Sequence, residues 1–136
     1  MRRTAWIASV VLGVLLIVGG IGTWIIVSNT LAEESITVSD DASCLAGDDV
    51  NGPFSAYCQA EIINEHALNS TDGKTYAELD REDPLRQVAM NASFLRASLF
   101  TSVVAFGVAG MAMLMGIVFI LIGLGIKDVA EKTGTV

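Results

Sequence analysis

The chain has 136 residues, of which 52% are hydrophobic, and its formal net charge is −7. An acidic chain repels nucleic acid and acidic lipid headgroups, so neither is expected as a ligand. The apolar residues gather in two uncharged runs, residues 5–27 and 97–126, and the 69 residues between them are close to the lower limit for a domain that folds without staples.

The first apolar run, residues 5–27, predicts a transmembrane helix. Its 23 uncharged residues exceed the roughly 20 that a helix needs to cross a bilayer. A cleaved signal peptide is the alternative, because Arg2 and Arg3 precede the run and Thr30-Leu31-Ala32 resembles a cleavage site. The run is too long for the apolar part of a signal peptide, so we expect an uncut span.

The distribution of charge predicts the orientation of the chain. The tails, residues 1–4 and 127–136, carry a net charge of +2, whereas residues 28–96 carry 13 acidic side chains against four basic ones. Short segments rich in Lys and Arg stay in the cytoplasm. We therefore expect a plasma-membrane protein with two spans and both termini cytoplasmic. The extracytoplasmic loop, residues 28–96, is acidic and should attract a basic partner surface.

Both cysteines of the chain, Cys44 and Cys58, lie in this loop. Outside the membrane no glutathione pool keeps thiols reduced, which favours a disulfide. Metal binding together with His66 is the alternative, but it needs a fourth ligand, and the spacing matches no zinc pattern. The segment between the cysteines is rich in turn signals, above all Asn51-Gly52-Pro53.

Several short elements are expected in the loop. Residues 35–39 alternate and could form a short strand. A helix is expected after Cys58 and should end at residues 70–73. Residues 75–78 have the spacing of a capping box, which predicts a second short helix. The apolar stripe of the first of these helices consists of Ala56, Ala60, Ile63 and Ala67.

Asp83-Pro84 is a strong start signal for the last helix, with aspartate as N-cap and proline at the first position. Nothing interrupts the pattern that follows, so we expect one helix from Pro84 to about Ile126, about 64 Å long. Its first part is a juxtamembrane helix that organises the loop, and residues 97–126 are the second span. The expected loop-facing stripe consists of Leu85, Val88, Ala92, Leu95 and Leu99.

Neither span contains an ionisable residue, which argues against a pump, a transporter or a bis-histidine haem protein. Small residues four apart, which let helices approach closely, suggest packing faces instead. On the first span these are Ser9 with Gly13 and Gly19 with Thr23. The second span offers enough of them for a second, intermolecular face. The expected helix-packing residues there are Ser98, Ser102, Ala105, Ala109, Ala112 and Gly116.

Three other features suggest ligands, but a plainer interpretation is preferred for each. Residues 111, 113 and 115 are methionines, yet their spacing spreads them around a helix, which favours apolar packing over Cu(I) binding. The pairs at 40–41 and 48–49 are aspartates without EF-hand spacing. His66 lies among polar residues and is expected to be solvated. We therefore expect no catalytic, cofactor or metal site.

The chain resembles a family of actinobacterial membrane proteins in its first 22 residues, its external cysteine pair and the stretch from Cys58 to Phe100. These are the accessory subunits of the cytochrome bcc–aa3 respiratory supercomplex, in particular the respiratory supercomplex association factor. The resemblance implies a non-catalytic subunit of the plasma membrane, bound to cytochrome bcc and aa3 oxidase subunits that carry the cofactors. It implies no cofactor and no catalytic residue in this chain.

The sequence thus predicts an all-α membrane protein. Two transmembrane helices form a hairpin with a small, disulfide-stapled, mostly helical extracytoplasmic loop. The expected function is that of a non-catalytic accessory subunit, which helps a large membrane complex to assemble or to remain stable. The alternatives are a self-associating membrane protein or regulator whose loop binds a partner, and, much less favoured, a membrane enzyme that uses His66 with loop carboxylates.

Overall fold

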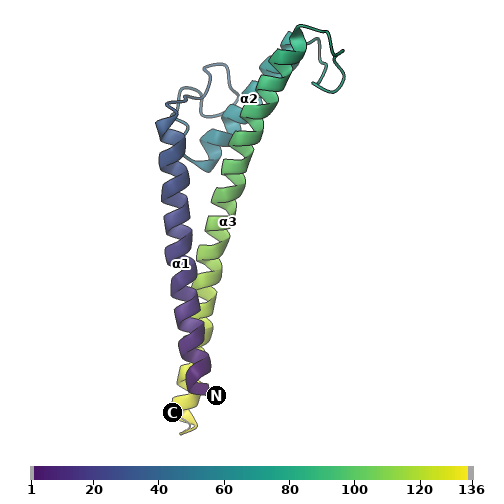
Figure 1. Ribbon diagram of the computed structural model, residues 1–136. Coiled ribbons are helices and arrows are strands. Elements are labelled where there is room, and N and C mark those ends of the chain that lie inside the picture. Colours follow the sequence, from purple (N-terminus) through teal and green to yellow (C-terminus); the bar gives the residue numbers. More distant parts are fainter. Residues whose placement is uncertain (1, 135–136) are drawn as a thin grey trace. The chain divides into compact units, whose positions relative to one another are not determined.

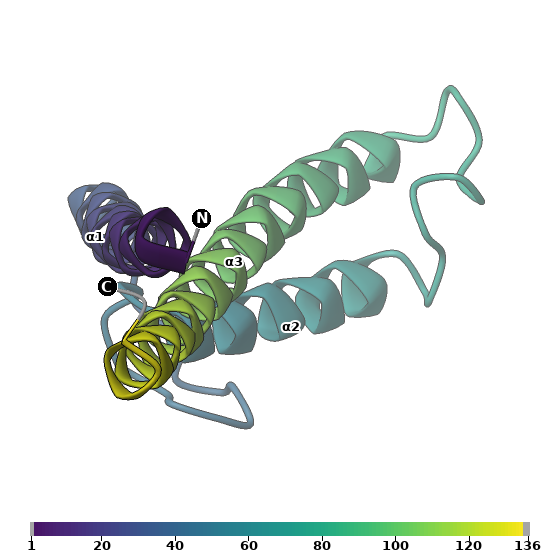
Figure 2. The same cartoon turned by 90° about the horizontal axis from the view of Figure 1, so that it is seen from below.

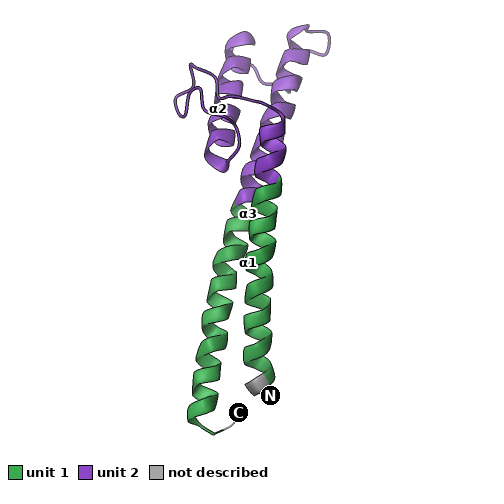
Figure 3. Ribbon diagram, turned by 90° about the vertical axis from the view of Figure 1, so that its left-hand side faces the viewer, with its two compact units in different colours: residues 1–26, 107–136 green, residues 27–106 purple. Residues whose placement is uncertain are grey.

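The computed structural model describes residues 2–134, with side chains from Thr4 onward. Three helices are present in this range: α1 (Arg2–Glu33), α2 (Pro53–Ser70) and α3 (Leu85–Lys132) (Figure 1). The chain divides into two compact units. Unit 1 contains residues 1–26 and 107–136, and unit 2 contains residues 27–106 (Figure 3). The all-helical expectation is confirmed, and both long helices are apolar enough to span a membrane.

Both long helices extend beyond the apolar runs. α1 continues past Val27 to Glu33, and α3 begins one residue after Pro84 and continues past Ile126 to Lys132. At the start of α3, a carboxylate oxygen of Asp83 accepts a hydrogen bond from the backbone N–H of Leu85 at 2.8 Å. The helices therefore include much of the expected tails, of which residues 1, 135 and 136 and the side chains of residues 2–3 lie outside the described part.

In unit 1, α1 and α3 form an antiparallel pair whose backbones touch at glycines. A Cβ atom placed on Gly13 would lie 2.6 Å from the carbonyl oxygen of Gly116, and a Cβ on Gly116 would lie 2.6 Å from that of Gly13. A Cβ on Gly20 would lie 2.7 Å from the carbonyl oxygen of Ala109, and a Cβ on Gly123 would lie 3.0 Å from that of Trp6. Only glycine can occupy these positions without displacing the opposite helix.

Unit 2 has its own hydrophobic core. Ala56 and Ala60 of α2 and Phe106 of α3 are almost fully buried. Val38 and Val50, from the loop between α1 and α2, join them. Figure 2 shows α2 beside the N-terminal part of α3, from which this core is built. Small residues on the buried face of α2 allow it to lie close to the loop and to α3. Leu31, Cys58 and Leu99 complete the buried cluster.

The expected strand at residues 35–39 does not form. Only one isolated bridge, antiparallel between Thr37 and Asp49, connects this segment to the chain that follows. Around it, Val38 donates to the carbonyl of Asp48 at 2.9 Å, and Val50 donates to that of Ile36 at 2.8 Å. The alternation that suggested a strand reflects the burial of Val38.

α2 begins five residues before Cys58, earlier than expected. Gly52 is the N-cap, and Pro53 occupies the first helical position. The hydroxyl of Ser55 accepts hydrogen bonds from the backbone N–H groups of Asn51 and Gly52, at 3.3 and 3.2 Å. Because proline has no N–H and fits the first turn of a helix, the turn signal at Asn51-Gly52-Pro53 is also a helix start. α2 ends at Ser70, as the break at residues 70–73 indicated.

The expected short helix at residues 75–78 is only a turn. The carboxylate of Glu78 accepts hydrogen bonds from the backbone N–H and the hydroxyl of Thr75, at 2.8 and 2.9 Å. These contacts lower the pKa of Glu78, because the backbone N–H favours the ionised carboxylate. One half of the capping box therefore forms, and it closes a single turn that ends before Asp80.

Candidate interaction surfaces

The predicted disulfide between Cys44 and Cys58 is confirmed, with the two Cα atoms 5.7 Å apart. Cys58 lies inside α2 and is buried, whereas Cys44 lies in the loop. The bond therefore fastens an irregular loop to a regular helix. A second contact acts in the same way, because the side-chain oxygen of Gln59 accepts a hydrogen bond from the backbone N–H of Ser39 at 3.0 Å.

The fastened loop presents four exposed carboxylates, those of Asp40, Asp41, Asp48 and Asp49. We call residues 40–49 the acidic loop. Gly47 donates to the carbonyl of Val38 at 2.9 Å and thereby closes the loop between the two pairs. The backbone at Gly47 has a positive φ of 79°, which glycine adopts without strain. Negative charge is thus concentrated on one rigid loop rather than spread over a flexible one.

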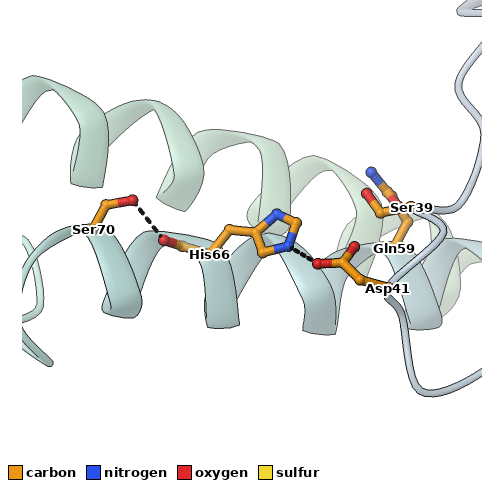
Figure 4. Close-up of polar contacts among 5 residues, drawn as sticks. All are labelled: Ser39, Asp41, Gln59, His66 and Ser70. Carbon is orange, nitrogen blue, oxygen red and sulfur yellow. Dashed lines mark hydrogen bonds and ion pairs between the residues drawn. The ribbon is translucent and has the colours of Figure 1, made fainter.

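His66 faces one of these carboxylates. Its Nε2 lies 2.6 Å from Oδ2 of Asp41, and both side chains are substantially exposed (Figure 4). The hydrogen bond from His66 lowers the pKa of Asp41 below its ordinary value of 3.8. The nearby hydroxyl of Ser70 donates to the backbone carbonyl of His66 at 2.8 Å instead of reaching the imidazole. The pair therefore connects the acidic loop to α2.

This pair gives a direct prediction for pH dependence. Replacing His66 by alanine should raise the pKa of Asp41 back toward 3.8, because the hydrogen bond to its carboxylate is lost. The stabilisation from the pair is complete above 3.8 and disappears as the pH falls through the lowered pKa. Carboxyl carbon chemical shifts measured during an NMR titration will report both values. The pKa of Glu78, which Thr75 lowers, is the internal control and should not move.

The ligand-binding alternatives gain no support from the positions of their residues. In the described part of the chain, no three His, Cys, Asp or Glu side chains could hold a metal ion together. The methionines at 111 and 115 are largely exposed, whereas Met113 packs against Gly20.

The helix-packing residues expected on the second span divide into two groups. Ala109 and Gly116 contact α1 within unit 1, so they close the hairpin of this chain and are not free to receive a partner. Ala112 lies only about 40° from Gly116 around the helix, on the same side. Ser98 is exposed, and Ser102 and Ala105 are half-buried, all three in unit 2. Ala109 and Gly116 therefore give no support to a second, intermolecular face on the second span.

The spacing of four identified Gly13, Ala109 and Gly116 of the hairpin contact but missed two other glycines in it. Gly20 and Gly123 contact the opposite helix, whereas the expected Gly19 has nothing within 4 Å of its Cβ position. The usable signal is a spacing of seven residues. Gly13 and Gly20 are seven apart on α1, and on α3 the set is Ala109, Gly116, Gly123 and Ala130. A spacing of seven keeps one side of a helix facing its neighbour over many turns.

The outer surface of unit 1 is apolar on both helices. Large aliphatic side chains point away from the helix contact, and Leu114 retains 67% of its accessible surface. Others with similar exposure are Leu15, Val18, Ile26 and Leu121. By contrast, Ser9 turns inward and donates a hydrogen bond to the carbonyl of Phe119 at 2.7 Å. Between the charged ends of the two helices, unit 1 thus exposes mainly large apolar side chains.

In unit 2, α3 does not use the expected loop-facing stripe as a whole. Leu99 is buried, and so is Ala89, but Leu85, Val88 and Leu95 are exposed. An open cavity of about 300 Å³ lies between the exposed stripe and α2, lined by Ile63, His66, Ala67, Ser70, Val88, Asn91, Ala92 and Leu95. Arg96 of α3 also contacts α2, with its guanidinium 3.8 Å from a carboxylate oxygen of Glu61 and above the ring of Phe100.

Comparison with known proteins gave no match: no family model, no curated protein and no solved structure is similar to this chain.

Proposed function

We propose that this protein is a membrane-embedded, non-catalytic accessory subunit. Unit 1 anchors it in the bilayer, and unit 2 presents the acidic loop to a partner on the extracytoplasmic side. The observation that carries the proposal is the surface of unit 1, where large apolar side chains of both helices face outward. Such a surface is stable only against lipid or other apolar protein.

The low burial of the two long helices supports insertion over a soluble fold. Within the most apolar part of each helix, only 11% of α1 residues and 17% of α3 residues are buried in the chain itself. The core helix of a soluble protein would be mostly buried. The two helices touch through glycines, as membrane helices commonly do, because lipid provides no hydrophobic drive for packing.

Residues typical of a membrane interface stand at the ends of the apolar runs. Trp6 is the second residue of the first run, and the ammonium group of Lys127, just after the second run, lies 5.4 Å from the centre of the Trp6 ring. Tryptophan and lysine are both enriched at the boundary between lipid and water. Arg96 directly precedes the second run. The positive tails support cytoplasmic termini, and the disulfide supports a loop on the oxidising side.

The acidic loop supports a partner with a basic surface. Its four carboxylates are exposed, and within the chain Asp41 is hydrogen-bonded to His66. Complementary charge guides two surfaces together and fixes their register. The resemblance to accessory subunits of the bcc–aa3 supercomplex suggests cytochrome bcc and aa3 oxidase subunits as that partner. The role would then be in assembly or stability of the complex, with the cofactors on the partner subunits.

The alternative is a self-associating membrane protein or regulator. The outer surface of unit 1 could face a second copy as well as a different subunit, and the acidic loop could bind an external ligand. Isolation of the tagged chain from its native membranes in a mild detergent separates the two. We expect integral membrane subunits carrying redox cofactors to accompany it. Recovery of only copies of the same chain would contradict the accessory role and favour self-association.

A variant with fewer negative charges tests whether the acidic loop binds the partner. Replacing Asp40, Asp48 and Asp49 by asparagine should lower partner recovery several-fold at low salt, because the complementary charge is lost. Asp41 is kept because it binds His66. The matched control removes the same charge from the exposed residues Asp72, Asp80 and Glu82, far along the chain from the acidic loop. Equal loss in both variants would show that only overall charge matters.

A further inference from the structure

The start of α2 carries an exposed aromatic side chain in an uncharged stretch of an otherwise acidic segment. Phe54 retains 76% of its accessible surface, and Tyr57, one turn later, retains 47%. Residues 50–60 contain no charged side chain, although the segment 28–96 to which they belong has a net charge of −9. An aromatic residue exposed to this degree is costly in water, so the environment of this turn needs an explanation.

Contacts within unit 2 place this turn at the end of the apolar runs. The hydroxyl of Ser28, the first residue after the first run, donates a hydrogen bond to the carbonyl of Asn51 at 2.6 Å. The ring of Tyr57 lies 6.0 Å from that of Phe100, edge to face, and Phe100 is the fourth residue of the second run. Both runs therefore reach α2 at its first turns.

The direction of α2 places Phe54 farther along the second apolar run than Tyr57. Glu61 pairs with Arg96, which precedes the second apolar run, and Tyr57 contacts Phe100 inside that run. α2 therefore runs antiparallel to α3, and Phe54 lies about 10 Å along α2 from Glu61, toward the apolar end. Phe54, Tyr57 and Glu61 fall on one stripe of the helix, aromatic toward the runs and charged away from them.

The helix start is also prepared for a poorly hydrated site. The first turn of a helix leaves backbone N–H groups without partners, which is unfavourable away from water. Pro53 removes one of these N–H groups, because proline has none, and the hydroxyl of Ser55, itself buried, accepts from the N–H groups of Asn51 and Gly52, the two residues just before the helix. The usual acidic residue of a first turn is absent as well.

We propose that the first two turns of α2 insert into the headgroup and upper acyl region of the bilayer, with Phe54 as the anchor. The occupant of this surface is lipid, since the apolar runs that define the bilayer end at the same place. Aromatic rings favour that boundary, and interfacial helices bury about 5–10 Å into it. The anchor would hold the acidic loop at a fixed height above the membrane. This inference rests on the proposed insertion of unit 1.

Quenching of tryptophan fluorescence by brominated lipid tests the anchor. The full chain, with Trp6 and Trp24 replaced by phenylalanine and Phe54→Trp added, is reconstituted in phosphatidylcholine vesicles with bromine near the headgroup end of the acyl chains. We expect several-fold stronger quenching than for Leu85→Trp in the same background. Leu85 is also exposed, but it lies about 23 Å along α3 from Phe100, away from the second run.

A third protein, which retains Trp24 as its only tryptophan, reports insertion of unit 1 independently. If Trp24 is quenched and Phe54→Trp fluoresces like a residue in water, the anchor is wrong and insertion stands. If Phe54→Trp has the blue-shifted emission of a buried residue without quenching, a protein chain covers it, which also overturns the lipid anchor. If Trp24 is not quenched by bromine at any depth, the proposed insertion fails, and the anchor fails with it.

Discussion

Replacing Gly116 by alanine is expected to destabilise the helical hairpin of unit 1 by about 1–3 kcal/mol, the usual cost of forcing extra atoms into a packed site. The added Cβ would lie 2.6 Å from the carbonyl oxygen of Gly13 and 2.7 Å from a side-chain carbon of Ile17. The carbonyl belongs to helix backbone and cannot rotate away. The two helices must therefore separate, and the contact at Gly20 would weaken with them.

Other glycines of α3 provide matched controls for this experiment. Gly110 and Gly125 have nothing within 4 Å of their Cβ positions. The same change to alanine there should leave stability unchanged or increase it by about 0.5–1 kcal/mol, because alanine favours the helix. The measurement is the unfolding free energy in mixed micelles titrated with SDS, followed by energy transfer between labels on α1 and α3. A similar loss at all three positions would refute a specific close contact.

A double substitution sharpens the result. Gly13 and Gly116 face each other, so their effects should not add. Once one alanine has pushed the helices apart, the second meets more space. If the costs of Gly13→Ala and Gly116→Ala sum fully, the two residues act at independent sites, and the symmetrical contact would be wrong.

The existence of the helices could be predicted from the sequence, but their contacts could not. Length and the absence of charge identify the two apolar helices, and Asp83-Pro84 locates the start of α3 to within one residue. Hydrophobicity does not indicate which face of a span packs against the other helix, because lipid-facing and helix-facing residues are both apolar. The spacing of four found at Ala112 and Gly116 is satisfied on any helix rich in small residues. The spacing of seven at Gly13 and Gly20 was the more informative one.

The loop shows a different reason for error. The spacing of Thr75 and Glu78 predicted a short helix, and only a turn forms, because whether such a turn extends into a helix depends on the residues that follow. At residues 35–39, a strand needs a partner of matching length, and the sequence does not specify one. The disulfide could be predicted because it depends on the compartment and on there being two cysteines, and not on local geometry.

Removing the disulfide should have the second large effect. Replacement of Cys44 and Cys58 by alanine should destabilise unit 2 by about 3 kcal/mol, since a crosslink closing a loop of about 15 residues removes that much from the entropy of the unfolded chain. The effect should concentrate in the loop that the bond fastens. There, the backbone bonds from Val50 to Ile36 and from Val38 to Asp48 depend on the loop staying against α2.

Amide hydrogen exchange resolves this prediction residue by residue. The N–H groups of Val38, Gly47 and Val50 should exchange faster in the variant, because each donates to a carbonyl within the fastened loop. Amides of unit 1 around Gly13 and Gly116 provide the comparison and should keep their protection. Unchanged exchange at Val50 would mean that the buried core around Val38 and Phe106 holds the loop without the bond.

The consequence for function follows from where the loop's charge sits. If the loop detaches from α2, Asp41 loses its contact with His66, and the four carboxylates no longer form one surface. Reduction of the native protein should then lower partner recovery as strongly as neutralising Asp40, Asp48 and Asp49, although every charge is still present. Recovery that survives reduction but not neutralisation would show that the partner recognises charge alone. Loss in both cases would show that it recognises charge held in place by the disulfide.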